Sequence, residues 1–250
     1  MEQDKMQIEG RNPIWEALKA KKSIEKLFIQ KNLDAGRMRE LITLAKRNNV
    51  LIEYVPKAKL DDITQTYKHQ GMIGVLPAVD YSDFDEMIKQ AFEKEESPLF
   101  VALDEIQDPH NLGAIIRSAE CSGAAGVIVT QRRSAPLSAV AYKASAGAVE
   151  HIPIARVKNL VDAIEDMKQS GIWVIGTDAQ GEAYTKADLT GPMAFVIGSE
   201  GKGMRRLVKE KCDSVVAISM HGKINSLNAS VASGVLLFES VRQRALEEEI

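Results

Sequence analysis

Polar side chains that could hold and align a small molecule gather in three short stretches of the chain. The stretches are 104–114 with an arginine shortly after it, 198–204 and 218–228, and they supply Asn111, Arg117, Glu200, Ser226 and Asn228. Amide, carboxylate, hydroxyl and guanidinium groups hydrogen-bond a polar substrate and orient it for reaction. Taken singly, each has an ordinary explanation as a helix cap or a surface ion pair. Together they predict a small-molecule pocket with a polar reacting partner, without identifying the reaction.

Each of these stretches follows an apolar run that reads as a buried strand. The runs are 99–103, 194–198 and 215–218. Further strands are expected at 126–130 and 172–176 and an edge strand at 151–154, with helices at 112–121, 160–169 and 204–211. Almost wholly apolar strands belong to sheets that are covered on both faces, and open α/β sheets bind ligands at the carboxyl ends of their strands. The pattern predicts a mostly parallel, doubly wound α/β sheet whose strand ends carry the pocket.

The front of the chain predicts a separate, smaller α/β domain. Its expected strands are 26–30, 50–55 and 71–76, and its expected helices are 35–48, 57–67 and one that Asn12 caps and Pro13 starts. An acidic segment with one helical pattern follows. The predicted domains are therefore residues 1–78, a connection over 79–97, and residues 98–250.

Composition excludes several classes of protein. The chain is 45% hydrophobic and 27% charged, with a net charge of −3, as in ordinary globular proteins. No apolar run approaches the roughly 18 residues of a membrane span, so we expect no membrane association. Cys121 and Cys212 form no disulfide framework and the four histidines have no metal-ligand spacing. We therefore expect a cytoplasmic protein with reduced cysteines and no metal.

The glycines of 198–204 do not have the spacing of a nucleotide-phosphate loop. They read Gly-x-x-Gly-x-Gly, whereas the dinucleotide fingerprint is Gly-x-Gly-x-x-Gly and a P-loop ends in Lys-Ser/Thr. Glu200 within this loop would also repel a phosphate. A nucleotide-dependent oxidoreductase is therefore disfavoured.

With all three stretches in hand, the chain resembles a known family. The motifs are Asp108-Pro109-His110-Asn111-Leu112-Gly113 with Arg117, Ile197-Gly198-Ser199-Glu200-Gly201-Lys202-Gly203-Met204, and Ser226-Leu227-Asn228-Ala229-Ser230-Val231-Ala232. They look like the three motifs of the SpoU (TrmH) family, RNA ribose 2′-O-methyltransferases of the SPOUT superfamily. Gly10-Arg11-Asn12, Glu16-Ala17-Leu18 and His69-Gln70-Gly71 resemble the substrate-binding domain of the RlmB branch, which has an L30e-like fold. Asn225 stands where a small residue such as serine is expected.

The resemblance implies a function, a fold and partners. The function is transfer of a methyl group from S-adenosylmethionine to a guanosine ribose of 23S rRNA, free or in a precursor ribosomal particle. The fold is a methyltransferase domain with a C-terminal trefoil knot and the L30e-like domain before it. A homodimer with its pocket near the subunit interface is implied as well.

The same resemblance assigns roles to individual residues. Cofactor binding falls to Gly198, Ile218 and Leu227, largely through backbone groups, and to Thr177. Positioning of Arg117 and the ribose falls to Asn111, Glu200, Ser226 and Asn228. Because a guanidinium stays protonated, Arg117 is expected to bind the phosphate beside the ribose, with that phosphate or water taking the proton. RNA contacts fall to Arg11, Asn12 and His69.

Two other functions are compatible with these motifs. One is a methyltransferase of the same family that acts on tRNA, since the motifs do not specify the substrate. The other is a catalytically silent rRNA-binding protein that assists ribosome assembly. The presence of all the catalytic motif residues disfavours the second reading.

Overall fold

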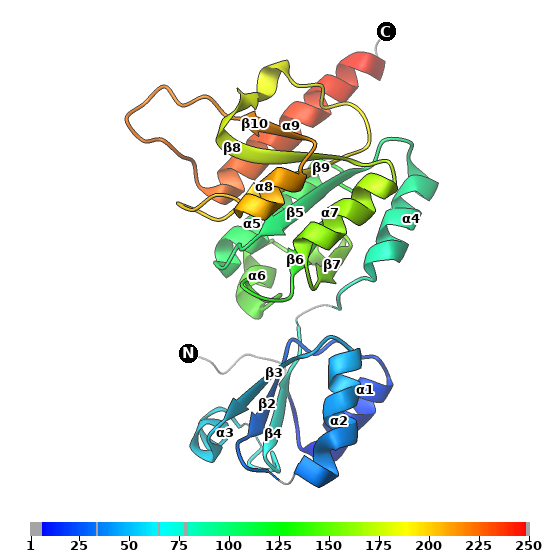
Figure 1. Ribbon diagram of the computed structural model, residues 1–250, viewed down its shortest axis with the longest axis vertical. Coiled ribbons are helices and arrows are strands. Elements are labelled where there is room, and N and C mark those ends of the chain that lie inside the picture. The colour runs from blue at the N-terminus through cyan, green and yellow to red at the C-terminus, as the bar shows by residue number, and fades with distance from the viewer. Residues whose placement is uncertain (1–6, 34, 65, 78–79, 249–250) are drawn as a thin grey trace. The chain divides into compact units, whose positions relative to one another are not determined.

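The protein divides into two compact units. The computed structural model describes residues 7–33, 35–64, 66–77 and 80–248 (Figure 1). The N-terminal unit runs to Asp80 and also includes the short segment Pro136–Ala139, and the rest of the chain from Tyr81 forms the C-terminal unit. The boundary expected between residues 78 and 79 lies outside the described residues. Each unit has its own sheet and its own apolar core.

The N-terminal unit is a small α/β domain with a four-stranded sheet in the order β1-β4-β2-β3. The strands are β1 (Gln7–Glu9), β2 (Lys26–Gln30), β3 (Leu51–Val55) and β4 (Met72–Val75), and the helices are α1 (Arg11–Lys19), α2 (Ala35–Arg47) and α3 (Lys57–Ile63). Strands β2 and β3 are parallel, and the other two pairs are antiparallel. Apolar side chains of α1 and α2 pack on one face of the sheet through Ile14, Leu18 and Leu41, while Leu60 of α3 packs on the other with Ile73.

The start of α1 differs from the expectation. The helix begins at Arg11, and its N-cap is Gly10, whose φ of 87° is in the left-handed region; no side chain caps it. The expected cap by Asn12 is therefore wrong, and Pro13 sits within the first turn, where its missing N–H costs nothing. Strand β1 was not expected at all, because three residues are too short for a readable alternation.

The C-terminal unit contains a six-stranded sheet in the order β10-β8-β9-β5-β6-β7, and every pair is parallel. Its strands are β5 (Leu99–Asp104), β6 (Gly126–Thr130), β7 (Ile154–Val157), β8 (Trp173–Ala183), β9 (Met193–Gly198) and β10 (Ser214–Ala217). The predicted doubly wound parallel sheet is confirmed. The edge strand does lie at an edge, but it begins at Ile154, after Pro153, and a 3₁₀ turn occupies Ala148–Glu150.

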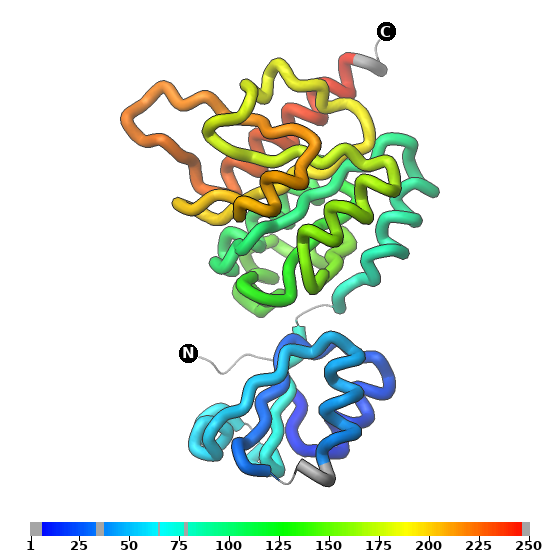
Figure 2. Tube along the Cα trace, in the orientation of Figure 1, coloured from blue at the N-terminus to red at the C-terminus, as the bar shows by residue number. Residues whose placement is uncertain are grey.

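Helices cover both faces of this sheet, as the ribbon and the chain trace show (Figures 1 and 2). One face carries α4 (Phe84–Lys94), α7 (Leu160–Gln169) and α8 (Arg206–Lys211), and the other carries α5 (Pro109–Cys121), α6 (Ala139–Ala144) and α9 (Ala229–Glu248). The acidic segment contributes α4, whose Met87, Ile88 and Ala91 are buried in the core of the C-terminal unit. That helix is therefore part of the C-terminal unit.

Helix α9 is fastened to the segment between β8 and β9. The hydroxyl of Ser240 donates to the carbonyl of Leu189 at 2.7 Å, and Arg244 donates through its Nη2 to the carbonyl of Gly191 at 2.9 Å. The Nη1 of Arg244 also donates to the carbonyl of Ser97, two residues before β5. These contacts fix the helix that follows the third polar stretch against the body of the sheet.

Candidate active site

The glycine-containing stretch forms a closed turn at the carboxyl end of β9. Ser199 and Gly203 exchange two backbone hydrogen bonds of 3.1 and 2.8 Å. Gly201 and Gly203 have φ values of 78° and 66°, which favour glycine. A Cβ on Gly198 would lie 2.3 Å from the carbonyl carbon of Gly203, so the turn closes only over a glycine. The turn leaves Glu200 exposed at its tip.

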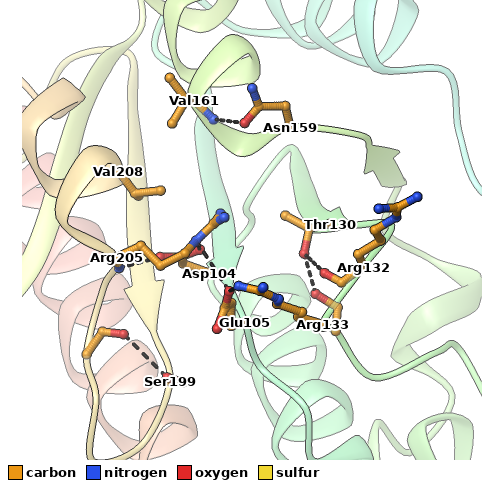
Figure 3. Close-up of polar contacts among 12 residues, drawn as sticks. Asp104, Glu105, Thr130, Arg132, Arg133, Asn159, Val161, Ser199, Arg205 and Val208 are labelled. Atoms are coloured by element: carbon orange, nitrogen blue, oxygen red, sulfur yellow. Dashed lines mark hydrogen bonds and ion pairs between the residues drawn. The ribbon is translucent and has the colours of Figure 1, made fainter.

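An ion pair with a buried carboxylate anchors this turn to the end of β5 (Figure 3). Asp104, which is 0% exposed, accepts from the backbone N–H of Arg205 at 2.7 Å and from its Nε at 2.8 Å. Glu105, in the left-handed region at φ 60°, pairs with Arg133 at 3.0 Å. Charge-assisted bonds to a buried carboxylate are strong. The first and second polar stretches are therefore joined rigidly.

Asn111, Glu200 and Asn228, one from each polar stretch, form a hydrogen-bonded triangle. The amide of Asn111 donates to Oε1 of Glu200 at 2.9 Å, and the amide of Asn228 donates to Oδ1 of Asn111 at 2.9 Å. Asn228 also donates to Oε1 of Glu200. The fold thus brings together side chains that are 28 to 117 positions apart in the sequence.

Asn228 also caps helix α9. Its Oδ1 accepts from the backbone N–H of Ser230 at 2.9 Å and from that of Val231 at 3.4 Å, as an N-cap side chain does. Because the carbonyl oxygen serves the helix, the amide nitrogen is held facing the triangle, which fixes its donor role.

A cavity of about 350 Å³ adjoins the triangle. Its walls come from the middle of β8, the ends of β9 and β10, the second and third polar stretches and the first turns of α9: Thr177, Asp178, Ala179, Ile197, Gly198, Ser199, Glu200, Gly201, Lys202, Gly203, Val216, Ile218, Met220, Asn225, Ser226, Leu227, Ala229, Ala232 and Leu236. All four residues expected to bind a cofactor, Gly198, Ile218, Leu227 and Thr177, line it. Ser226 lines it too, outside the triangle. Cavities of this size hold small ligands.

The lining suits a ligand with an apolar ring and a polar, positively charged end. Ile197, Val216 and Leu236 give an apolar wall, and Asp178 gives a carboxylate. A hydrogen bond from the backbone N–H of Gln180, followed by the Lys209 ammonium, holds the pKa of Asp178 below its ordinary value. Sequence reasoning missed Asp178; its only signal was its place next to Thr177 after the 172–176 strand. The Thr177 hydroxyl itself donates to the carbonyl of Val196 at 2.9 Å.

A second cavity, of about 250 Å³, lies on the other side of Glu200. It is lined by Glu105, Ile106, Gln107, Asp108, Asn111, Ser199, Glu200 and Lys202. Ser199, Glu200 and Lys202 line both cavities. The site can therefore hold two ligands side by side, with the Glu200 carboxylate between them.

Arg117 does not join the triangle within one chain. It is exposed on α5, and it has no hydrogen bond or ion pair with any described residue. It lies six positions after Asn111, which places it about 9 Å further along the helix and about 120° around it. The two side chains therefore point to different sides of α5.

The three expected RNA contacts lie together in the N-terminal unit, but in different surroundings. Arg11 and Asn12 are exposed in the first turn of α1. His69 is buried, and its Nδ1 accepts from the backbone N–H of Gly71 at 3.0 Å while Nε2 lies 2.9 Å from the carboxylate of Asp61. Both ring nitrogens are thus engaged within the chain, so the ring organises its loop.

Membrane spans and metal sites are not found in the part of the chain that the structure describes. None of its helices is both long and apolar enough to cross a bilayer. Among the same residues, no three His, Cys, Asp or Glu side chains are grouped so as to hold a metal ion.

A nucleoside-sized cavity at the carboxyl ends of a parallel sheet marks a ligand-binding α/β protein. Residues 98–238 match the SpoU rRNA Methylase family, and residues 7–82 match the RNA 2′-O ribose methyltransferase substrate binding family. The chain belongs to the SpoU (TrmH) family of RNA methyltransferases. YacO of Bacillus subtilis (strain 168), named as a TrmH family protein, is 47% identical over 98% of both chains, and a TrmH family protein of Staphylococcus saprophyticus is 42% identical over 95% of both.

Solved structures support the same assignment and identify the cofactor. An rRNA methyltransferase from Sinorhizobium meliloti with bound AdoMet aligns with a TM-score of 0.61 at 28% identity, covering 95% of this chain and 87% of that one. The SpoU methyltransferase AviRb from Streptomyces viridochromogenes with AdoMet aligns with a TM-score of 0.61 at 27% identity, covering 97% and 91%. The cofactor of this family, and of this chain, is S-adenosylmethionine.

Proposed function

We propose that the protein transfers the methyl group of S-adenosylmethionine to the 2′-hydroxyl of a guanosine ribose in 23S rRNA. The observation that carries this proposal is the triangle of Asn111, Glu200 and Asn228 standing between two cavities. The larger cavity has the size and the mixed lining that the cofactor requires. The smaller one, beside the carboxylate, is where the acceptor ribose enters.

Methyl transfer to a hydroxyl requires a held donor, an aimed acceptor and a place for the proton. S-adenosylmethionine supplies an electrophilic methyl group when bound. In the triangle, both amide donors bind Oε1 of Glu200, and the backbone N–H of Ala229 also approaches it at 3.4 Å. No described residue bonds Oε2. That oxygen is therefore available to accept the hydrogen bond of the ribose hydroxyl and so to align it, which is worth orders of magnitude in rate. The adjacent RNA phosphate or water takes the hydroxyl proton as the oxygen–methyl bond forms.

We further propose that the protein acts as a homodimer and that Arg117 reaches the acceptor site of the partner subunit. Arg117 points away from the triangle of its own chain. It is carried by α5, which packs against α9, and α9 exposes Val231 at 51% and Phe238 at 50%. An exposed apolar stripe of this kind fits a subunit interface. In the partner's site the guanidinium would bind the phosphate next to the ribose and orient it.

The N-terminal unit is proposed to present the RNA, with Arg11 and Asn12 as direct contacts. His69 takes the role of shaping the loop beside them. We also propose that the C-terminal segment is threaded as a trefoil knot and that the protein works in the cytoplasm, in keeping with its free cysteines, Cys121 and Cys212.

A tRNA substrate is the second candidate. It is favoured by the names of the relatives, which are called tRNA/rRNA methyltransferases, and by the likeness to a TrmH/SpoU tRNA modifying enzyme of A. aeolicus, with a TM-score of 0.57 at 26% identity. That likeness covers 66% of this chain, whereas the 23S rRNA proposal also uses the N-terminal unit.

Replacing Glu200 with Gln tests the proposed chemistry. We expect methyl transfer to fall roughly 100-fold, the scale of losing one preorganised electrostatic contact, while S-adenosylmethionine affinity by calorimetry changes little. Glu210→Gln, at an exposed carboxylate of α8, is the matched control and should transfer methyl groups normally. Normal turnover by Glu200→Gln would refute the role given to the triangle.

A further inference from the structure

Tyr67 of the N-terminal unit has a conformation that ordinary folding preferences disfavour. Its side chain is 83% exposed, and its φ of 58° lies in the left-handed region. A bulky residue rarely adopts that region. Because this backbone conformation costs free energy, the surrounding structure must hold it in place, and such residues concentrate at functional sites.

The carboxylate of Glu9, at the end of β1, holds the backbone on the N-terminal side of Tyr67. The hydroxyls of Thr64 and Thr66 both donate to Oε2 of Glu9, the first at 2.7 Å. The Thr64 hydroxyl in turn accepts from the backbone N–H of Tyr67 at 2.9 Å. The backbone of Tyr67 is therefore tied to the sheet, while its ring stays outside.

The C-terminal side of the loop is held as firmly. His69 is buried between Asp61 and the backbone N–H of Gly71. The side-chain oxygen of Gln70 accepts from the backbone N–H of Arg11 at 3.3 Å. That contact holds the loop beside the first turn of α1, where the side chains of Arg11 and Asn12 are exposed.

We propose that Tyr67 is a stacking platform for an unpaired RNA base, with Lys68 and Arg11 contacting the flanking phosphates. This inference rests on the proposed RNA substrate and names how the N-terminal unit recognises it: through a base that is splayed out of a loop or bulge. Proteins read such bases by stacking them on aromatic rings. A ring on a fixed backbone is well suited to this, because it loses little conformational freedom on binding.

Full-length protein and transcribed 23S rRNA test the proposal by filter binding. We expect Tyr67→Ala and Tyr67→Asn to weaken binding roughly 5- to 150-fold, the range of about 1–3 kcal/mol per stacked base. Asn tolerates the left-handed region, so Tyr67→Asn removes the ring with little backbone disturbance. Tyr67→Phe keeps the ring and should bind like wild type. Tyr54→Ala removes another exposed tyrosine of the same unit, at 51% exposure, and is the matched control.

Salt dependence separates stacking from charge. The Tyr67 variants should lower affinity by the same factor at every salt concentration, whereas Lys68→Ala should lower the slope of log affinity against log salt by about 0.7. Equal RNA affinity of wild type and Tyr67→Asn would overturn the stacking role alone. If Tyr67→Asn bound RNA like wild type but bound another protein differently, Tyr67 would belong to a protein interface. Wild-type protein that binds S-adenosylmethionine but neither rRNA nor tRNA would overturn the proposed function and this inference together.

Discussion

Mixing two inactive variants tests whether Arg117 acts on the partner subunit's site. Arg117→Ala removes the guanidinium, and Glu200→Ala removes the carboxylate of the triangle. Within one chain the Arg117 side chain starts about 9 Å along α5 from Asn111 and about 120° around the helix. Each variant alone should lose methyl transfer roughly 100-fold or more. If the two residues of one working site come from different chains, mixed dimers regain one complete site each.

The recovered activity can be calculated. Random reassociation of equal amounts makes about half of the dimers mixed, and one of the two sites in each is then intact. The mixture should therefore show about one quarter of wild-type activity per chain. The two variants carry different tags and are co-expressed, and the fraction of mixed dimers is counted. Methyl incorporation into 23S rRNA is then measured.

A reciprocal mixture strengthens the test. Wild type mixed with the double variant, Arg117→Ala with Glu200→Ala, should keep about one quarter of wild-type activity if Arg117 acts across the interface, and about one half if it acts within its own chain. Inactive mixtures of the single variants, together with one half in the reciprocal mixture, would refute the cross-subunit role.

Three further predictions concern the C-terminal unit. Asp104→Asn weakens two bonds to Arg205 and should lower the free energy of unfolding in urea by about 1.5–3 kcal/mol, while Glu210→Gln at an exposed pair should change it by less than about 0.5 kcal/mol; equal effects would contradict the anchoring role. Asp178→Asn should weaken S-adenosylmethionine binding in calorimetry. Because a backbone N–H donor lowers the pKa of Asp178, its carboxylate stays charged above pH 3.8 and loses its charge only as the pH falls below that value. Its contribution to S-adenosylmethionine affinity should follow the same course. An affinity that already declines between pH 7 and 5 would argue against this role. Burial raises the pKa of the Cys212 thiol to about 12, so this thiol should resist iodoacetamide at pH 8 until urea unfolds the protein. The contribution of the neutral thiol to the free energy of unfolding is fully present below pH 9 and declines as the pH rises toward 12. Rapid alkylation of the folded protein, seen by mass spectrometry, would contradict the burial of this thiol.

Apolar runs and motif spacing were enough to predict the sheet of the C-terminal unit. Strands such as 126–130 and helices such as 160–169 lie where the pattern placed them. The shifted edge strand and the missed 139–144 helix are short elements whose bounds depend on packing: Gly113 of α5 allows so close an approach that a Cβ would lie 2.4 Å from the carbonyl of Ala141. The hydrophobic periodicity of the sequence does not reveal such contacts between elements.

Sequence reasoning named most residues of the candidate site but not their connections. Asn111, Glu200 and Asn228 were expected near one another, and the structure shows them in direct contact. The ion pair of the buried Asp104 with Arg205 and the place of Asp178 in the cavity depend on three-dimensional geometry, because their partners are distant in sequence. The cap by Asn228 is a local contact, with Ser230 and Val231, in a stretch that offers several possible capping residues. None of these three features could be assigned before the fold was known.

Mapping the methylated nucleotide tests the account most directly. Labelled S-adenosylmethionine is incubated with the protein and with 23S rRNA or bulk tRNA in parallel, and the labelled nucleotide is then identified. The account predicts label in 23S rRNA as 2′-O-methylguanosine. Label in tRNA alone, or on a base in place of the ribose, would contradict it.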